Sequence, residues 1–260
     1  MRGMRLPWEA TVPLALITIW QIVSLTGWLP RTAMPAPTDV LVAGGKLIYS
    51  GALFRHLAVS AGRAAMGFAI GGSIGFLLGL WTGSSIWADR LFDGTVQMLR
   101  AVPHLALTPL IILWMGIGET PKIFLVALGV IFPIYINTSH AIRSVDSGLI
   151  EMGRVYGLGP RDMFQRVVFP GALPGILVGV RYALGVAWLT LIVAETISAS
   201  SGIGYLAMTA REFLWTDVIV FCILIYALLG KAADSAARWL ERRCLRWHPN
   251  YQPVRKREAA

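Results

Sequence analysis

The sequence predicts an all-α membrane protein that crosses the bilayer about six times. Its composition is the first indication: 56% of the 260 residues are hydrophobic and only 14% are charged. A soluble domain is about 45–50% apolar and about 25% charged, and a water-soluble fold of this length could not bury so much apolar surface. The second indication is the order of the sequence, in which long uncharged runs alternate with short segments that carry the basic residues.

Six segments are long and apolar enough to cross a hydrocarbon core about 30 Å thick, which takes about 20 residues of helix. They are residues 11–28, 57–83, 86–116, 121–142, 170–197 and 217–240. We expect them to form a single transmembrane domain over the whole chain, 1–260. A cleaved signal peptide is the alternative for the first segment, but a small-x-small cleavage site is lacking, so we favour a retained anchor. The loop that follows should hold a short amphipathic helix, with Thr38 as its candidate N-cap.

The positions of Lys and Arg set the expected orientation, because cytoplasmic loops are enriched in both residues. With the N-terminus inside, about fifteen basic residues fall on the inner side and about five or six on the outer side. The outer group consists of Arg31, Lys46, Arg55, Lys122 and Arg211, with Arg63 at its margin. We therefore expect both termini to lie in the cytoplasm.

The net charge of +9 raises the question of nucleic-acid binding. A nucleic-acid-binding protein gathers its basic residues on one face, whereas here they lie at the chain ends and in the central stretch 143–169. That distribution fits cytoplasmic loops. We expect contact with membrane lipid and none with nucleic acid.

The sequence lacks a recognisable catalytic or metal-binding set. The four histidines are scattered without ligand spacing, and no paired carboxylates or nucleophile elbow occur. A phosphate-binding loop needs Gly-Lys followed by Ser or Thr, but Gly45-Lys46 precedes Leu47 and Gly230-Lys231 precedes Ala232. We therefore expect no enzyme activity, no metal and no cofactor bound by this chain.

Glycines recur every four residues in the second apolar segment, at Gly67, Gly71, Gly75 and Gly79. This spacing places them on one face of a helix. A face of small residues lets another helix backbone approach closely, which favours helix association in lipid. We expect a packing face within the bundle.

The polar stretch 143–169 is expected to form two short helices joined at 157–159. Gly157 can take the left-handed conformation that ends a helix, and Pro160 suits the first turn of the next. Met163, Phe164 and Val167 give the second helix an apolar side. A short helix with an apolar knob at the cytoplasmic face of a membrane is typical of a docking element for another protein.

This stretch resembles the EAA loop of ABC-importer permeases. Glu151, Gly157 and Pro170 fall on the spacing of that motif, while Met152 and Gly153 replace its two alanines and Val167 and Phe169 replace its Ile and Leu. In that family the loop is the coupling helix, which sits in a groove of the ATPase subunit. The resemblance therefore implies an ATPase-coupling role for Glu151, Gly157, Pro160, Met163, Phe164, Val167 and Pro170.

Three further runs, 99–118, 132–137 and 195–206, are similar to permeases of the nitrate/sulfonate/taurine family, above all those for aliphatic sulfonates. The resemblance implies a type I ABC-importer permease fold in the bacterial inner membrane. It also implies a homodimer, two ATPase subunits that bind the ATP, and a periplasmic substrate-binding protein. The expected substrate is a small organic anion, with an aliphatic sulfonate first and taurine or nitrate as alternatives.

Polar residues inside membrane segments are costly and are therefore candidates for function. The candidates for the substrate path are Arg100, His104, Asn137, Arg181 and Glu195. Glu195 should lie near the outer end beside the turn at 202–204, with Arg100 and Arg181 in the inner half. A path rich in arginine and histidine, with Glu195 as its single nearby acid, would suit an anion. Hydrogen bonding between helices or snorkelling is the alternative role for each.

An ion-coupled secondary transporter is the alternative class of protein. It would be expected to show inverted repeats and an acid in the middle of the membrane. No convincing internal repeat is present. A membrane enzyme ranks third, because no catalytic set supports it.

Overall fold

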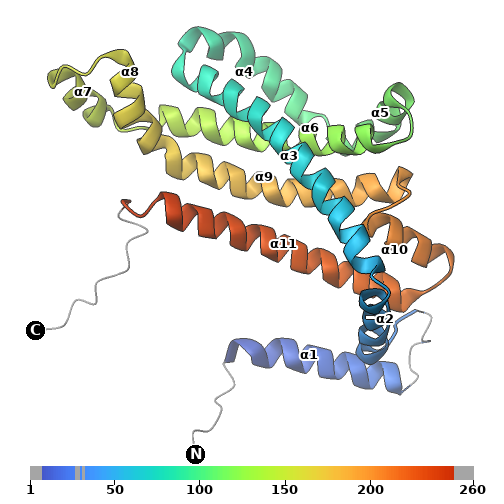
Figure 1. Cartoon of the computed structure of the whole chain (residues 1–260). Coiled ribbons are helices and arrows are strands. Elements are labelled where there is room, and N and C mark those ends of the chain that lie inside the picture. The colour runs from blue at the N-terminus through green and yellow to red at the C-terminus, as the bar shows by residue number, and fades with distance from the viewer. Residues whose placement is uncertain (1–7, 27–29, 31–32, 249–260) are drawn as a thin grey trace, which may run out of the picture. The chain divides into compact units, whose positions relative to one another are not determined.

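The computed structural model describes residues 8–26, 30 and 33–248, and all the regular elements in that part of the chain are helices (Figure 1). Four helices are long: α3 (Ala52–Ser84), α6 (Glu119–Arg143), α9 (Phe169–Ser198) and α11 (Thr216–Cys244). The shorter helices are α1 (Trp8–Leu25), α2 (Pro37–Tyr49), α4 (Ile86–Ala101), η1 (His104–Leu107), α5 (Thr108–Met115), α7 (Ser147–Val155), α8 (Pro160–Met163), η2 (Phe164–Val168) and α10 (Ile203–Glu212). The predicted all-α, multi-helix membrane fold is confirmed.

Within the described residues, the four long helices are apolar enough to cross a membrane, and α9 does so together with α8 and η2 as one stretch, Pro160–Ile197. A fifth span results if the bent pair of α4 with η1–α5 is counted as one. The first predicted segment, 11–28, corresponds to a shorter apolar helix, Thr11–Leu25, and residues 27 and 28 lie outside the described part. The count of six spans stays a prediction.

The third predicted segment, 86–116, forms two helical pieces, α4 and η1–α5. Its two halves meet at an angle of 74°. The break lies at Val102 and Pro103, both of which have extended backbone conformations. A proline disfavours the helical conformation of the residue before it, so α4 ends here and η1 begins after Pro103.

Helix α2 begins earlier than expected. Its N-cap is Ala36 and Pro37 is its first residue, so Thr38 lies inside the helix and is not the cap. Proline is favoured at this first position, where its missing N–H is not needed. Asp39 then accepts a hydrogen bond from the backbone N of Ala36 over 3.4 Å.

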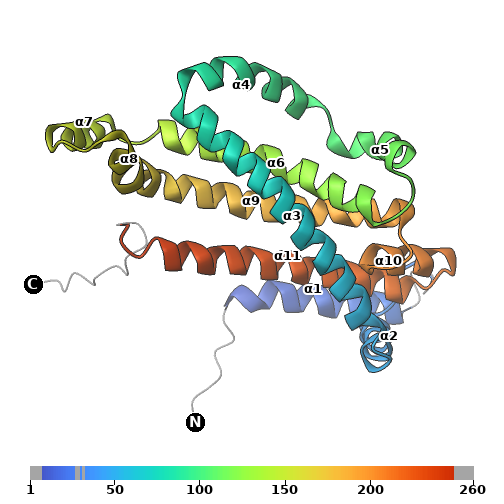
Figure 2. The ribbon, with the colours of Figure 1, turned by 45° about the horizontal axis from the view of Figure 1, so that its top comes forward.

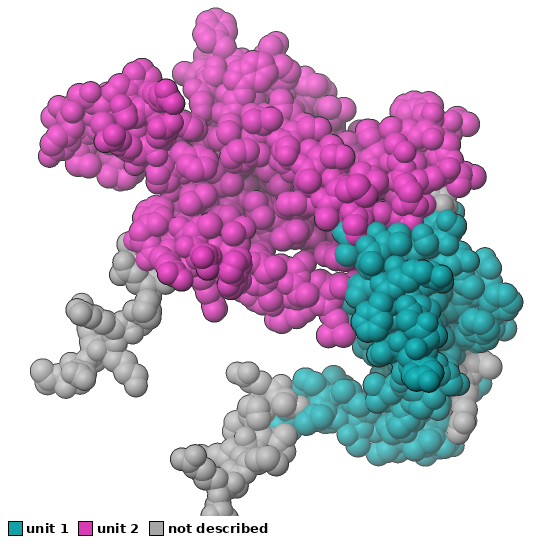
Figure 3. Space-filling view, in the orientation of Figure 1, with its two compact units in different colours: residues 1–61, 195–227 teal, residues 62–194, 228–260 magenta. Residues whose placement is uncertain are grey.

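The chain divides into two compact units (Figure 3). Unit 1 consists of Met1–Ala61 and Glu195–Ala227, and its core is formed by Val40, Leu53, Ile203, Phe221 and Cys222. Unit 2 consists of Gly62–Ala194 and Leu228–Ala260. Its central core joins α3, α6 and α9 and contains Ala64, Val126, Val130, Ile134, Ala183, Ala187 and Leu191.

In unit 2, α6 runs beside α9 in both views of the ribbon (Figures 1 and 2). The glycine ridge of α3 lies against α6. A Cβ atom added at Gly71 would lie 2.2 Å from the carbonyl oxygen of Ala127, and one at Gly75 would lie 2.4 Å from that of Ile131. A Cβ atom added at Gly67 would lie 2.6 Å from the side chain of Val126, and one at Gly79 would lie 2.7 Å from that of Thr138. The absence of side chains on this face therefore allows the two backbones to touch.

Candidate substrate path and coupling segment

The predicted coupling segment, residues 143–169, consists of two helical pieces joined by a glycine turn. Asp146 caps α7 by accepting a hydrogen bond from the backbone N of Gly148 over 2.8 Å. Gly157 has a φ of +76°, the left-handed conformation predicted from the sequence. The backbone N of Leu158 donates to the carbonyl of Gly153, which closes the end of α7. Pro160 then starts α8, which continues through η2 into α9.

The second piece of the segment packs on its own neighbours more than expected. The tip of Met163 lies against Gly153, where an added Cβ would be 2.8 Å from its Cε atom. The ring of Phe164 lies 6.1 Å from that of Phe169, and Phe164 and Val167 are half-buried. The Met163 side chain therefore fills the space beside Gly153.

The most exposed apolar side chains of the segment are on α7 instead. Val155 is 86% exposed and Tyr156, which follows α7, is 80% exposed, while Met152 is exposed on the same piece. Glu151 is also exposed beside them, whereas Pro170 is half-buried in α9. The exposure of Val155 and Tyr156 was not predicted from the sequence, in which the apolar side was expected on the second piece.

Three of the predicted path residues line one hollow of about 340 Å³ in unit 2, which we call the central hollow. They are Arg100 of α4, His104 of η1 and Asn137 of α6. Tyr182 and Val186 of α9, one residue with a hydroxyl group and one wholly apolar, also line this hollow. A space of this size, with few polar groups on apolar walls, is typical of a small-molecule site.

His104 is held in place at the edge of the central hollow. Its Nε2 atom lies 3.0 Å from Oγ1 of Thr190 on α9. Gly129 on α6 makes room for this pair, because an added Cβ there would be 3.0 Å from His104 Nε2 and 2.9 Å from Thr190 Oγ1. Asn137 donates its amide to the carbonyl of Pro133 over 2.8 Å, which fixes the side chain on its own helix.

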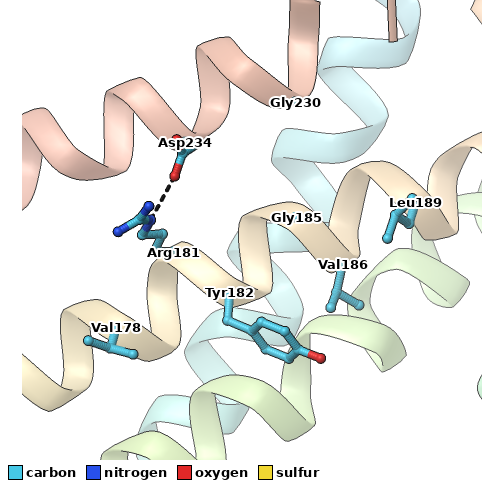
Figure 4. A pocket seen from close by; sticks show the side chains of 8 residues that line it. All are labelled: Val178, Arg181, Tyr182, Gly185, Val186, Leu189, Gly230 and Asp234. Atoms are coloured by element: carbon cyan, nitrogen blue, oxygen red, sulfur yellow. Dashed lines mark hydrogen bonds and ion pairs between the residues drawn. The ribbon is translucent and has the colours of Figure 1, made fainter. Parts of the chain in front are cut away.

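Arg181 lines a second hollow of about 470 Å³, which we call the α9–α11 hollow (Figure 4). Its walls are Val178, Arg181, Tyr182, Gly185, Val186 and Leu189 of α9 with Gly230 and Asp234 of α11. Tyr182 and Val186 line both hollows, so the two lie on neighbouring faces of α9.

The expectation that Glu195 is the single acid near the path is wrong. Nε of Arg181 lies 2.7 Å from Oδ1 of Asp234, and Arg238 also pairs with this carboxylate. Asp234 was not among the predicted path residues, although it lies within the predicted segment 217–240. An acid inside an apolar segment was the signal that could have identified it.

Glu195 lies in unit 1 and is buried. Its carboxylate accepts hydrogen bonds from the hydroxyl of Ser60 and from the backbone N of Gly204, at the turn beside which it was expected. The backbone N of Gly202 donates to Nδ1 of His56 over 3.0 Å. These contacts tie the turn before α10 to the start of α3, and they give Glu195 a structural role in this arrangement.

Two cations counted among the outer loops are buried in unit 2. Arg63 of α3 is 1% exposed and Lys122 of α6 is 2% exposed. Both pair with Glu119, at 2.5 Å from Arg63 and 3.5 Å from Lys122. Burial of a charge is costly unless it is paired, so this cluster fixes the start of α6 against α3.

Among the described residues, no group of His, Cys, Asp and Glu could hold a metal ion.

The long apolar helices, the hollows with charged walls and the exposed helical hairpin are the features of a multi-pass membrane transport subunit. The family described as "Binding-protein-dependent transport system inner membrane component" matches residues 71–246, and the chain belongs to this family.

Two relatives cover nearly the whole chain. One, from Escherichia coli K12, is 60% identical over 94% of this chain and 92% of its own length, and it is named an aliphatic sulfonates transport permease protein, SsuC. The second, from Bacillus subtilis 168, carries the same name and is 45% identical over 93% of this chain and 87% of its own length. A solved amino acid ABC transporter "with histidines" is similar in fold, with a TM-score of 0.64 over 76% of this chain and 97% of that chain, at 19% identity.

Proposed function

We propose that this chain is the membrane-spanning permease subunit of an ATP-driven importer that moves aliphatic sulfonates into the bacterial cytoplasm. The observation that carries this proposal is the 60% identity to the Escherichia coli relative over 94% of the chain. The two relatives at 60% and 45% identity are named for aliphatic sulfonates, and this degree of identity favours a sulfonate over taurine or nitrate as the substrate. An ion-coupled carrier is not favoured either, because the family depends on a binding protein.

The assembly that we propose contains two copies of this chain, two ATPase subunits and a periplasmic substrate-binding protein. It lies in the inner membrane with both termini of this chain in the cytoplasm and lipid around its apolar helices. ATP is bound and hydrolysed by the ATPase subunits. The coupling segment docks on them through the exposed apolar residues of α7, and we expect Val155 and Tyr156 to contribute to that contact.

The continuity of the coupling segment with α9 would transmit the movement of the ATPase subunits to the substrate path. The helical stretch Pro160–Ile197 has no break, although Phe164–Val168 is a π-helical turn, so a displacement of α8 would be passed to the residues that line both hollows. ATP binding would draw the two coupling segments together and open the path outward. The substrate would then pass from the binding protein into the path, and hydrolysis would reset it.

The test is growth of a strain that lacks the gene for this chain. Growth on hexanesulfonate as sole sulfur source should be lost, and should return with the gene but not with Gly157→Leu at equal membrane abundance. Growth on sulfate is the control and should not change. Normal growth of the deletion strain on alkanesulfonates, in the absence of a second sulfonate importer, would contradict the proposed function.

A further inference from the structure

The ion pair between Arg181 and Asp234 uses a single bond and leaves most of the guanidinium unused. Nε of Arg181 donates to Oδ1 of Asp234 over 2.7 Å (Figure 4). A guanidinium can instead hold a carboxylate with two parallel hydrogen bonds. No described residue pairs with the two terminal nitrogens of Arg181, whose side chain is 42% exposed in the α9–α11 hollow. These nitrogens are available to a second anion.

Asp234 also has a second partner. Its Oδ2 atom lies 2.6 Å from Nη2 of Arg238, one helical turn further along α11. With two arginines and one aspartate, this cluster has a net charge of +1. The carboxylate would therefore keep a partner if Arg181 left it. Pairing at rest also lowers the cost of holding Arg181 in a low-dielectric passage.

The rest of the hollow suits a short alkyl chain. Val178, Val186 and Leu189 form an apolar wall on α9 beside the charged cluster. Gly185 and Gly230 lack side chains, and a Cβ atom added at either would meet nothing within 4 Å. The open space of about 470 Å³ therefore has a charged end and an apolar flank.

We propose that the α9–α11 hollow binds the substrate during passage, with Asp234 as the resting counter-ion of Arg181. The sulfonate headgroup accepts hydrogen bonds from the terminal nitrogens of Arg181. This weakens the bond between Arg181 and Asp234, and Asp234 stays paired with Arg238. The alkyl chain lies along Val178, Val186 and Leu189. This inference rests on the proposed function, since it assigns a site to the proposed substrate.

The first test is equilibrium binding of labelled hexanesulfonate to the purified complex of this chain with its ATPase, without the binding protein. Asp234→Asn should tighten binding by about tenfold, because it removes a negative charge that competes for Arg181. Arg181→Ala should abolish measurable binding. A purely structural ion pair predicts the opposite sign for Asp234→Asn, so weaker or unchanged binding in that variant would overturn the proposal.

The matched control is Asp89→Asn, which removes the carboxylate of another interhelical arginine–aspartate pair, the one with Arg143. It lines neither hollow, so hexanesulfonate binding should stay at the wild-type value. Tighter binding in this control as well would show a general effect of charge and would overturn the assignment to Asp234.

The second test places a side chain in the hollow at Gly185, where an added Cβ atom would meet nothing within 4 Å. With the binding protein saturated, Gly185→Leu should lower the maximal uptake rate of decanesulfonate by at least about tenfold more than that of ethanesulfonate. Gly94→Leu, at another glycine with open space around it, is the control and should not change this ratio. An equal loss for both substrates in Gly185→Leu, or no loss for either, would overturn the inference. Failure of the wild-type complex to move any alkanesulfonate would instead refute the proposed function.

Discussion

The hydroxyl of Ser60 on α3 lies 2.8 Å from Oε1 of Glu195 on α9. The same hydroxyl accepts a hydrogen bond from the backbone N of Ile203 over 2.9 Å, and Gly204 donates its backbone N to Oε2 of Glu195. Glu195 is 1% exposed, and the turn at Gly202 fits closely around it. Within unit 1, the carboxylate therefore positions the turn that leads into α10.

Glu195→Ala should lower the thermal unfolding temperature of the purified protein by several degrees. It leaves buried donors without an acceptor, and each such group costs about 1–3 kcal/mol. Ser200→Ala, at an exposed position nearby, should leave the unfolding temperature unchanged. An unchanged unfolding temperature in Glu195→Ala, together with lost uptake, would contradict the structural role and indicate that Glu195 acts in the substrate path.

The close contact of α3 with α6 predicts a second stability difference. Gly71→Ala should destabilise the protein, because the added Cβ would lie 2.2 Å from the carbonyl oxygen of Ala127, closer than packing allows. Gly62→Ala, on the same helix with nothing within 4 Å, should be neutral or stabilising by about 0.5–1 kcal/mol. Unfolding in detergent measures both variants. Equal stability of the two would show that the ridge does not determine this packing.

Gly157→Leu should abolish ATP-driven uptake while the protein still inserts in the membrane. The φ of +76° at this turn costs a residue with a side chain about 1–2 kcal/mol, so the coupling segment would lose its shape. Gly159→Leu is the matched control, since Gly159 has a φ of −68° and open space around it. If uptake and co-purification of the ATPase both survive in Gly157→Leu, the coupling assignment is wrong.

The expected topology can be tested by cysteine labelling. Cysteines placed at Ser147 and Ser200, both exposed, in a background without Cys222 and Cys244, should react from opposite sides of the membrane. Ser147→Cys should label only from the cytoplasm and Ser200→Cys only from outside. Reaction of both from the same side would refute six spans with cytoplasmic termini.

The sequence was sufficient to predict the helices and the turn at Gly157, because apolar runs and glycine conformations are local properties. Pro103 marked a possible helix break in the sequence, but the 74° angle between the two helical pieces was not predicted. Ion pairs between residues far apart in the sequence were the main feature that could not be predicted. Asp234 lies 53 residues from Arg181, and Glu119 lies 56 residues from Arg63, so neither pair can be inferred from spacing along one helix.

The coupling segment shows the same limit on a smaller scale. The glycines at 157–159 and Pro160 correctly predicted two helical pieces, but they did not reveal which side chains stay exposed. Met163 lies against Gly153 and Phe164 beside Phe169, so the exposed apolar edge falls at Val155 and Tyr156. Exposure depends on tertiary packing, which a pattern of apolar residues in one short helix does not specify.

The most direct test of the proposed function is uptake of labelled hexanesulfonate by proteoliposomes that contain this chain, its ATPase and an excess of loaded binding protein. Uptake should require ATP inside the vesicles, stop when the ATPase cannot hydrolyse ATP, and persist when ionophores collapse the ion gradients. Excess sulfate should not compete. Uptake that continues without ATP and is abolished by ionophores would contradict the account and identify an ion-coupled carrier.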